Sequence, residues 1–190
     1  MNSVREMTGG PGRGLPALAP WVLLLGLLSS LPGYGQQPSK PANWEAWGFL
    51  LGEWVGEGSG QPGRGSGGFS FYLDLQERVL VRRNYARYPA TEKKPASSHD
   101  DIMVIHQEEG VTKAEYFDNE GHVIHYRVSF PKDSSSVMFL SDIRKSAPRY
   151  RLTYRKAGEG TVTIAFEIAP PGKPDVFSRY VEASAKKKGM

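Results

Sequence analysis

The sequence contains no cysteine among its 190 residues. This absence excludes disulfide bonds, thiolate zinc sites, iron–sulfur clusters and cysteine nucleophiles. A large excess of one charge sign is also missing, because 24 Lys and Arg against 20 Asp and Glu leave a formal net charge of +4. That charge is too small to indicate a nucleic-acid partner by itself. The 39% hydrophobic and 23% charged residues are typical of a globular chain, and exclude a disordered or multi-span membrane protein.

One apolar stretch stands apart from the rest of the chain, at residues 17–31, and two arginines precede it. Its length of about 15 residues is short for a membrane span and typical of the core of a signal peptide. Gly33 and Gly35 supply small residues at the spacing that a signal peptidase reads. We therefore expect residues 1–35 to be a signal peptide cleaved after Gly35. The mature protein would be exported, periplasmic or extracellular, without stable membrane insertion; an uncleaved anchor is the alternative.

The rest of the chain has the pattern of a single all-β domain. Residues 36–43 are polar, contain two prolines and read as a linker, and the domain is expected over residues 44–188. It begins with a short helical turn, where Trp44, Trp47 and Leu51 share one face. Ten segments then show strand patterns, separated by turn residues. They span residues 54–58, 69–75, 78–87, 99–107, 111–118, 122–130, 136–142, 149–155, 161–168 and 176–185.

Short strands in series with almost no helix predict an antiparallel up-and-down β-barrel. Closure into a barrel removes the unpaired edges of such a sheet. A barrel of eight to ten strands is wide enough to hold a small ligand. A two-sheet sandwich is the alternative fold.

The first strand carries a motif that resembles a known superfamily. Gly52-Glu53-Trp54, within FLLGEWVGEG, resembles the G-x-W signature of the calycins, which include lipocalins and fatty-acid-binding proteins. The resemblance implies that Trp54 closes one end of the barrel and packs under Arg179, in the segment FSRY. Over residues 44–186 the chain is most similar to an uncharacterised bacterial family of exported lipocalin-like proteins, and more distantly to nitrobindin-like haem barrels. The segment EYFDNEGHVIHY contributes to both similarities.

Haem binding, as in the nitrobindin-like proteins, is an alternative function but not the expected one, because those proteins hold iron through a histidine on a late strand. The four histidines here are at positions 99, 106, 122 and 125, so none follows residue 131. His122 and His125 lie on opposite faces of a strand and make a poor metal pair. We therefore expect no cofactor and no metal.

Side chains that alternate along the expected strands suggest the lining of an internal cavity. His99 and Asp101 share a side and could form a pair that orients the imidazole. Arg83 is the candidate counter-charge for an anionic or hydrogen-bonding head group. In the alternative interpretation, Arg82 and Arg83 lie on either side of the sheet and the tyrosines are ordinary strand formers. The candidate ligand-binding residues are Arg83, Tyr85, His99, Asp101, Tyr116, His122 and Tyr126.

These observations predict an exported barrel that binds a small apolar or amphipathic molecule. One alternative is an enzyme, with His99 or His122 as acid and base and Tyr126 or Arg83 stabilising charge. Another is an interaction module that uses the loops at residues 58–68 and 89–98. A nucleic-acid partner is not expected, because the lysines at 186–188 lack interleaved aromatic residues.

Overall fold

The computed structural model describes residues 43–57 and 65–189. The expected signal peptide, residues 1–35, and all of the expected linker except Asn43 lie outside the described residues. A single 3-10 turn, η1 (Glu45–Trp47), precedes the strands, and the described residues contain no helix long and apolar enough to span a membrane. The ten strands are β1 (Gly52–Glu57), β2 (Ser66–Asp74), β3 (Val79–Tyr88), β4 (Ser97–Glu108), β5 (Val111–Asp118), β6 (Val123–Ser129), β7 (Ser136–Ser141), β8 (Arg149–Gly158), β9 (Thr161–Ala169) and β10 (Ser178–Lys187).

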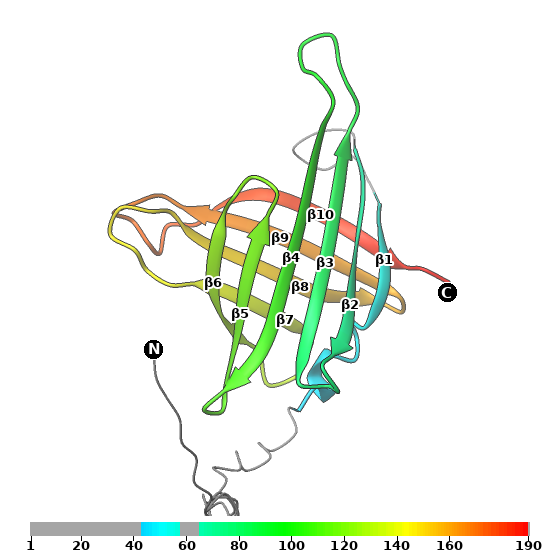
Figure 1. The fold of residues 1–190 in the computed structure, drawn as a ribbon, viewed down its shortest axis with the longest axis vertical. Coiled ribbons are helices and arrows are strands. Elements are labelled where there is room, and N and C mark those ends of the chain that lie inside the picture. The colour runs from blue at the N-terminus through cyan, green and yellow to red at the C-terminus, as the bar shows by residue number, and fades with distance from the viewer. Residues whose placement is uncertain (1–42, 58–64, 190) are drawn as a thin grey trace, which may run out of the picture. The chain divides into compact units, whose positions relative to one another are not determined.

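The strands form one closed, antiparallel, up-and-down barrel, as the sequence predicts. Each strand pairs with the next along the chain, and β1 pairs with β10 to close the barrel, placing Trp54 opposite Lys187. Closure excludes the alternative of an open two-sheet sandwich. In Figure 1, β2 to β6 run side by side across the front while β7 to β10 cross steeply behind them.

The two ends of the barrel differ in packing. Because successive strands reverse direction, every second connection lies at the same end of the barrel. We call the end with the β3–β4, β5–β6, β7–β8 and β9–β10 connections the loop end. The opposite end, where η1 lies, we call the helix end (Figure 1). At the helix end, Trp47 is fully buried and its ring lies 5.1 Å from Phe130 and 5.8 Å from Phe139, between ring centroids. Leu50 is also fully buried beside it. This end is therefore packed with side chains.

The expected helical turn exists but presents a different face. Trp44, Trp47 and Leu50 are buried, whereas Leu51 is half-buried. A 3-10 turn has three residues per turn, so positions three apart lie in line and Leu50 replaces Leu51 in the buried row.

Trp54 is buried at the start of the barrel, but its cationic neighbour is not the predicted one. The indole Nε1 donates to the carbonyl of Leu50 at 2.8 Å, and the Lys187 Nζ lies 5.8 Å from the centroid of the Trp54 ring. Gly52 adopts a φ of +108°, and a Cβ there would lie 3.2 Å from Lys187 Cε. The expectation that Arg179 packs on Trp54 is wrong. Arg179 lies eight residues away along β10 and pairs at the surface with Glu182, at 2.8 Å.

Candidate functional site

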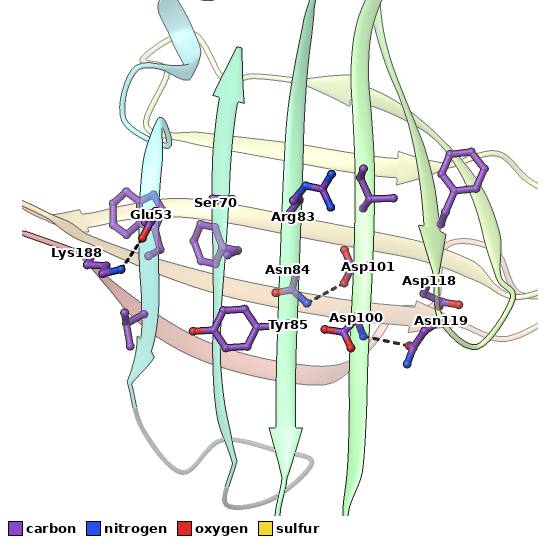
Figure 2. Close-up of a pocket in the computed structure, with 15 residues that line it drawn as sticks. Glu53, Ser70, Arg83, Asn84, Tyr85, Asp100, Asp101, Asp118, Asn119 and Lys188 are labelled. Carbon is purple, nitrogen blue, oxygen red and sulfur yellow. Dashed lines mark hydrogen bonds and ion pairs between the residues drawn. The ribbon is translucent and has the colours of Figure 1, made fainter. Parts of the chain in front are cut away.

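A buried ion pair occupies the interior of the barrel. Leu80 and Arg82 point inward from β3, and Arg82 Nη1 donates to Asp101 Oδ1 of β4 at 2.5 Å. The two side chains are only 7% and 3% exposed. Asn84 Nδ2 donates to the other carboxylate oxygen at 2.8 Å, an interaction drawn in Figure 2. Arg82 and Asn84 therefore hold the Asp101 carboxylate in place from the same strand.

His99 extends this cluster toward the loop end. Its Nε2 lies 3.3 Å from Asp101 Oδ2 and 3.1 Å from the Tyr116 hydroxyl, and its Nδ1 lies 3.0 Å from Glu120 Oε1. The hydrogen bond to Asp101, with help from Glu120, raises the pKa of His99 to about 9. His99 is therefore an imidazolium at neutral pH. In that form it can donate a proton but cannot act as a general base.

Tyr116 connects His99 to a second carboxylate. The Tyr116 hydroxyl donates to Asp118 Oδ2 at 3.1 Å, and His122 Nδ1 lies 2.8 Å from the same oxygen. Burial acts to raise the pKa of Asp118, but hydrogen bonds from the His122 amide and imidazole, the Glu120 amide and Tyr116 outweigh it and hold that pKa below its usual range. Burial, reinforced by Asp101 and Asp118, raises the pKa of Tyr116, so its hydroxyl stays protonated. The network thus runs from the barrel centre to the β5–β6 turn.

Two buried hydrogen-bond donors at the centre have no acceptor. Arg82 Nε and the Tyr154 hydroxyl are both buried, and neither has a hydrogen-bond partner among the residues that the structure describes. The two side chains are neighbours, with Arg82 Cζ 5.8 Å from the centroid of the Tyr154 ring. Burial raises the pKa of Tyr154 to about 12 against the opposing effect of the nearby Arg82 guanidinium, so its hydroxyl stays protonated and able to donate at neutral pH. Buried polar groups in proteins are nearly always paired, so an acceptor oxygen is the natural partner for these donors.

The inner wall between this cluster and the loop end is apolar but incompletely covered. Tyr150 stacks on Phe166 with ring centroids 5.9 Å apart and planes 9° apart. These inward side chains are half-buried, as Phe130 at the helix end is, so part of the wall surface is accessible to solvent. We call this set the loop-end lining: Tyr116, Ile124, Tyr150, Ile164 and Phe166.

The structure brings together most of the site residues predicted from the sequence. His99, Asp101 and Tyr116 are in direct contact, and His122 joins them through Asp118. Tyr126 is buried beside them, with its ring centroid 6.4 Å from that of Tyr116.

Arg83 and Tyr85 do not belong to this cluster. Arg83 is exposed and Tyr85 is 44% exposed, both on the outer face of β3, so the prediction that they face the interior is wrong. The inward residues are their neighbours Arg82 and Asn84, because alternation from the fully buried Leu80 fixes the phase of the strand.

Sequence reasoning missed four members of the network: Arg82, Asn84, Asp118 and Glu120. Arg82 enters the sequence prediction only in the alternative interpretation, in which it and Arg83 lie on opposite faces of the sheet. Asp118 and Glu120 lie at the β5–β6 turn, where carboxylates usually indicate solvent exposure. The signal that could have found Asp118 is its spacing of two from Tyr116, which puts both on one strand face.

Comparison with known proteins adds no assignment. No protein-family profile matches the chain, and no curated protein matches it. Within residues 43–57 and 65–189, no group of three His, Asp or Glu side chains is arranged to hold a metal ion. The likeness to calycins therefore rests on the barrel and on the Gly52–Trp54 motif, and at the level of a family it stays a prediction.

Proposed function

We propose that the protein binds a small amphipathic molecule inside the barrel, at the loop end. A hydrogen-bond acceptor of the ligand sits between Arg82 Nε and the Tyr154 hydroxyl, and its apolar body lies against the loop-end lining. The observation that carries the proposal is the pair of buried donors without an acceptor, next to inward apolar side chains that water still reaches.

The charges in the cluster define the head group further. Asp101 already balances Arg82 at 2.5 Å, and Asp101 also accepts from Asn84. An acceptor that carries no full charge, such as a carbonyl or hydroxyl oxygen, satisfies both free donors without adding unbalanced charge to a buried site. Binding strength would come from the apolar body, at roughly 25 cal/mol per Å² of buried apolar surface before ordering costs.

We place this binding activity outside the cytoplasm. The support is the signal-peptide pattern of residues 1–35, with its apolar core and the small residues Gly33 and Gly35. N-terminal sequencing of the protein secreted from its source cells should begin at Gln36. Recovery of the intact chain from the membrane fraction would contradict export by cleavage.

Native mass spectrometry and one isosteric variant test the binding proposal. Protein purified from its source cells should carry a small molecule that dissociates on activation in the spectrometer. Tyr154→Phe removes one hydroxyl and should weaken retention about fivefold, as expected for one hydrogen bond of about 1 kcal/mol. Without ligand, the same variant should differ little from the wild type in stability, because the neighbour of the lost hydroxyl is the Arg82 guanidinium, with which it makes no well-formed hydrogen bond.

Tyr85→Phe, on the outer face of β3, is the matched control and should retain the molecule unchanged. A spectrum of the apo mass alone, or equal loss of the molecule in both variants, would overturn the proposal.

A further inference from the structure

A hollow lies on the outer face of the barrel, across β1 to β5. It has a volume of about 720 Å³. Figure 2 shows side chains of its outer rows, including Glu53, Ser70, Arg83 and Tyr85, on neighbouring strands. We call it the outer groove. It contains the two predicted site residues that the interior cluster does not use, Arg83 and Tyr85.

One cross-strand row gives the outer groove an amphipathic character. Ser70, Arg83, Ile102 and Phe117 are directly opposite one another on β2, β3, β4 and β5. Adjacent strands are about 4.8 Å apart, so the row extends about 14 Å. Over these four strands, a hydroxyl and a guanidinium form one half of the row and an aliphatic and an aromatic side chain form the other. On β1, Glu53 lies opposite Ser70 and ends the row. Phe117 is 42% exposed, so its apolar surface is available.

Tyr85 adds a flat apolar surface beside the row. A Cβ at Gly68 would lie 2.9 Å from the Tyr85 hydroxyl and 2.5 Å from the carbonyl oxygen of Trp54. The phenol ring therefore lies directly on the β2 backbone, as Figure 2 shows, and a larger residue at position 68 would lift it. Because Gly68 has no side chain, the Tyr85 ring stays close to the β2 backbone and does not fill the outer groove.

The charges around the groove balance except at Arg83. Glu53 pairs with Lys188 at 2.8 Å, and Asp100 pairs with Arg87 at 2.7 Å. Arg83 Nε donates to the neutral Tyr72 hydroxyl at 3.0 Å, and within the described part of the chain its guanidinium has no carboxylate partner. One positive charge thus faces the groove uncompensated, with the Ser70 hydroxyl on the strand beside it.

We propose that the outer groove binds a monoanionic amphipathic organic acid. Its carboxylate accepts hydrogen bonds from the Arg83 guanidinium and the Ser70 hydroxyl, and its apolar body lies over Ile102 and Phe117. Guanidinium and carboxylate match in geometry and form strong charge-assisted hydrogen bonds. A phosphate with two charges is disfavoured, because Glu53 and Asp100 line the same groove. This site is independent of the binding proposed inside the barrel.

An NMR titration with 2-naphthoate tests the proposal on the folded protein. The probe should give nuclear Overhauser contacts to the Ile102 methyl groups and the Phe117 ring. Arg83→Gln should raise its Kd at least tenfold and Phe117→Ser at least threefold, and both residues are exposed enough to change without unfolding the barrel. The neutral analogue 2-naphthalenemethanol should bind the wild type at least tenfold more weakly.

Two controls separate this site from the interior one. Arg127→Gln removes an exposed arginine from β6, outside the groove, and should leave the Kd of 2-naphthoate unchanged. Tyr154→Phe should leave it unchanged as well. Contacts of the probe with Ile164 and Phe166 in place of Ile102, or an Arg83→Gln Kd equal to that of the wild type, would refute the outer groove and leave the interior proposal standing.

Discussion

Replacing Arg82 with methionine should destabilise the barrel far more than the loss of one surface arginine. Methionine has a similar length and no charge, so the substitution removes the partner of Asp101 with little change in packing volume. The Asp101 side chain is 3% exposed and cannot recover its lost interaction from water.

The cost follows from the buried charge that remains. Breaking a buried pair by removing one partner costs about 3–5 kcal/mol. Asn84 and the protonated His99 still contact Asp101, at 2.8 Å and 3.3 Å, so the lower end, about 3 kcal/mol, is expected. Asp101→Asn alone should cost about as much, because it leaves Arg82 unbalanced. The double variant removes both charges and should cost only about 1 kcal/mol, for the lost hydrogen bond.

Urea unfolding at pH 7, followed by tryptophan fluorescence, measures these differences. Arg87→Met is the matched control, since Arg87 makes the same kind of pair with Asp100 on the outer face of the same two strands, with side chains 48% and 45% exposed. It should cost about 0–1 kcal/mol. The reasoning fails if Arg82→Met behaves like Arg87→Met, or if the double variant is less stable than both single ones.

Three further perturbations have defined outcomes. The folded-state pKa of His99 is raised to about 9, so its stabilisation is full below pH 6.5 and is lost as the pH rises through about 9. The loss should be about 1–2 kcal/mol, since the ring is partly exposed, and His99→Gln should flatten the pH profile of urea unfolding between pH 6 and 10. Trp47→Ala empties the packed helix end and should lower the unfolding free energy by about 3–5 kcal/mol; a loss under 1 kcal/mol would contradict the assigned packing. Gly68→Ala places a Cβ 2.5 Å from the backbone carbonyl oxygen of Trp54 and should lower the free energy of unfolding, measured by thermal unfolding, by about 1–3 kcal/mol or more. At the control position, Gly110→Ala brings the new Cβ near no other atom and should show only the cost of the positive φ.

The barrel itself could be predicted from the sequence because its strands alternate cleanly. In β9 the inward residues Val162, Ile164 and Phe166 alternate with Thr161, Thr163 and Ala165, and the observed strand, Thr161–Ala169, differs by one residue from the expected 161–168. Turns rich in glycine, asparagine and proline then mark where each strand ends. Connectivity follows, since short turns force neighbouring strands to pair.

The inner face of β3 could not be predicted in the same way. The strand begins Val79-Leu80-Val81, an apolar run that gives no phase, so Arg82 and Arg83 were equally plausible inward residues. The register decides the phase, because Leu80 pairs with Ile105 and Arg82 with Met103, and those partners are fully buried. Which residues of β3 face inward therefore depends on its pairing with β4, and the sequence of β3 alone does not show this pairing.

The prediction of which cation packs on Trp54 was wrong for a related reason. The resemblance placed Arg179 there, but the position is set by which residue of β10 pairs with β1. That residue is Lys187, and the irregularity between Arg179 and Val181 shows that β10 is not uniform along its length. The C-terminal part of β10 pairs with β1 and closes the barrel, so the register of this pairing cannot be predicted from a motif at the N-terminal end of the strand.

The position of the Arg82–Asp101 pair argues for a role beyond stability. A buried ion pair often stabilises a protein no better than apolar residues of the same size. The helix end, where Trp47 and Leu50 are fully buried, is stabilised by apolar packing. The pair instead lies where complete packing gives way to the loop-end lining, and it leaves Arg82 Nε and the Tyr154 hydroxyl without acceptors. Stability alone does not require the two free donors, and the binding that we propose inside the barrel would complete them with an acceptor oxygen.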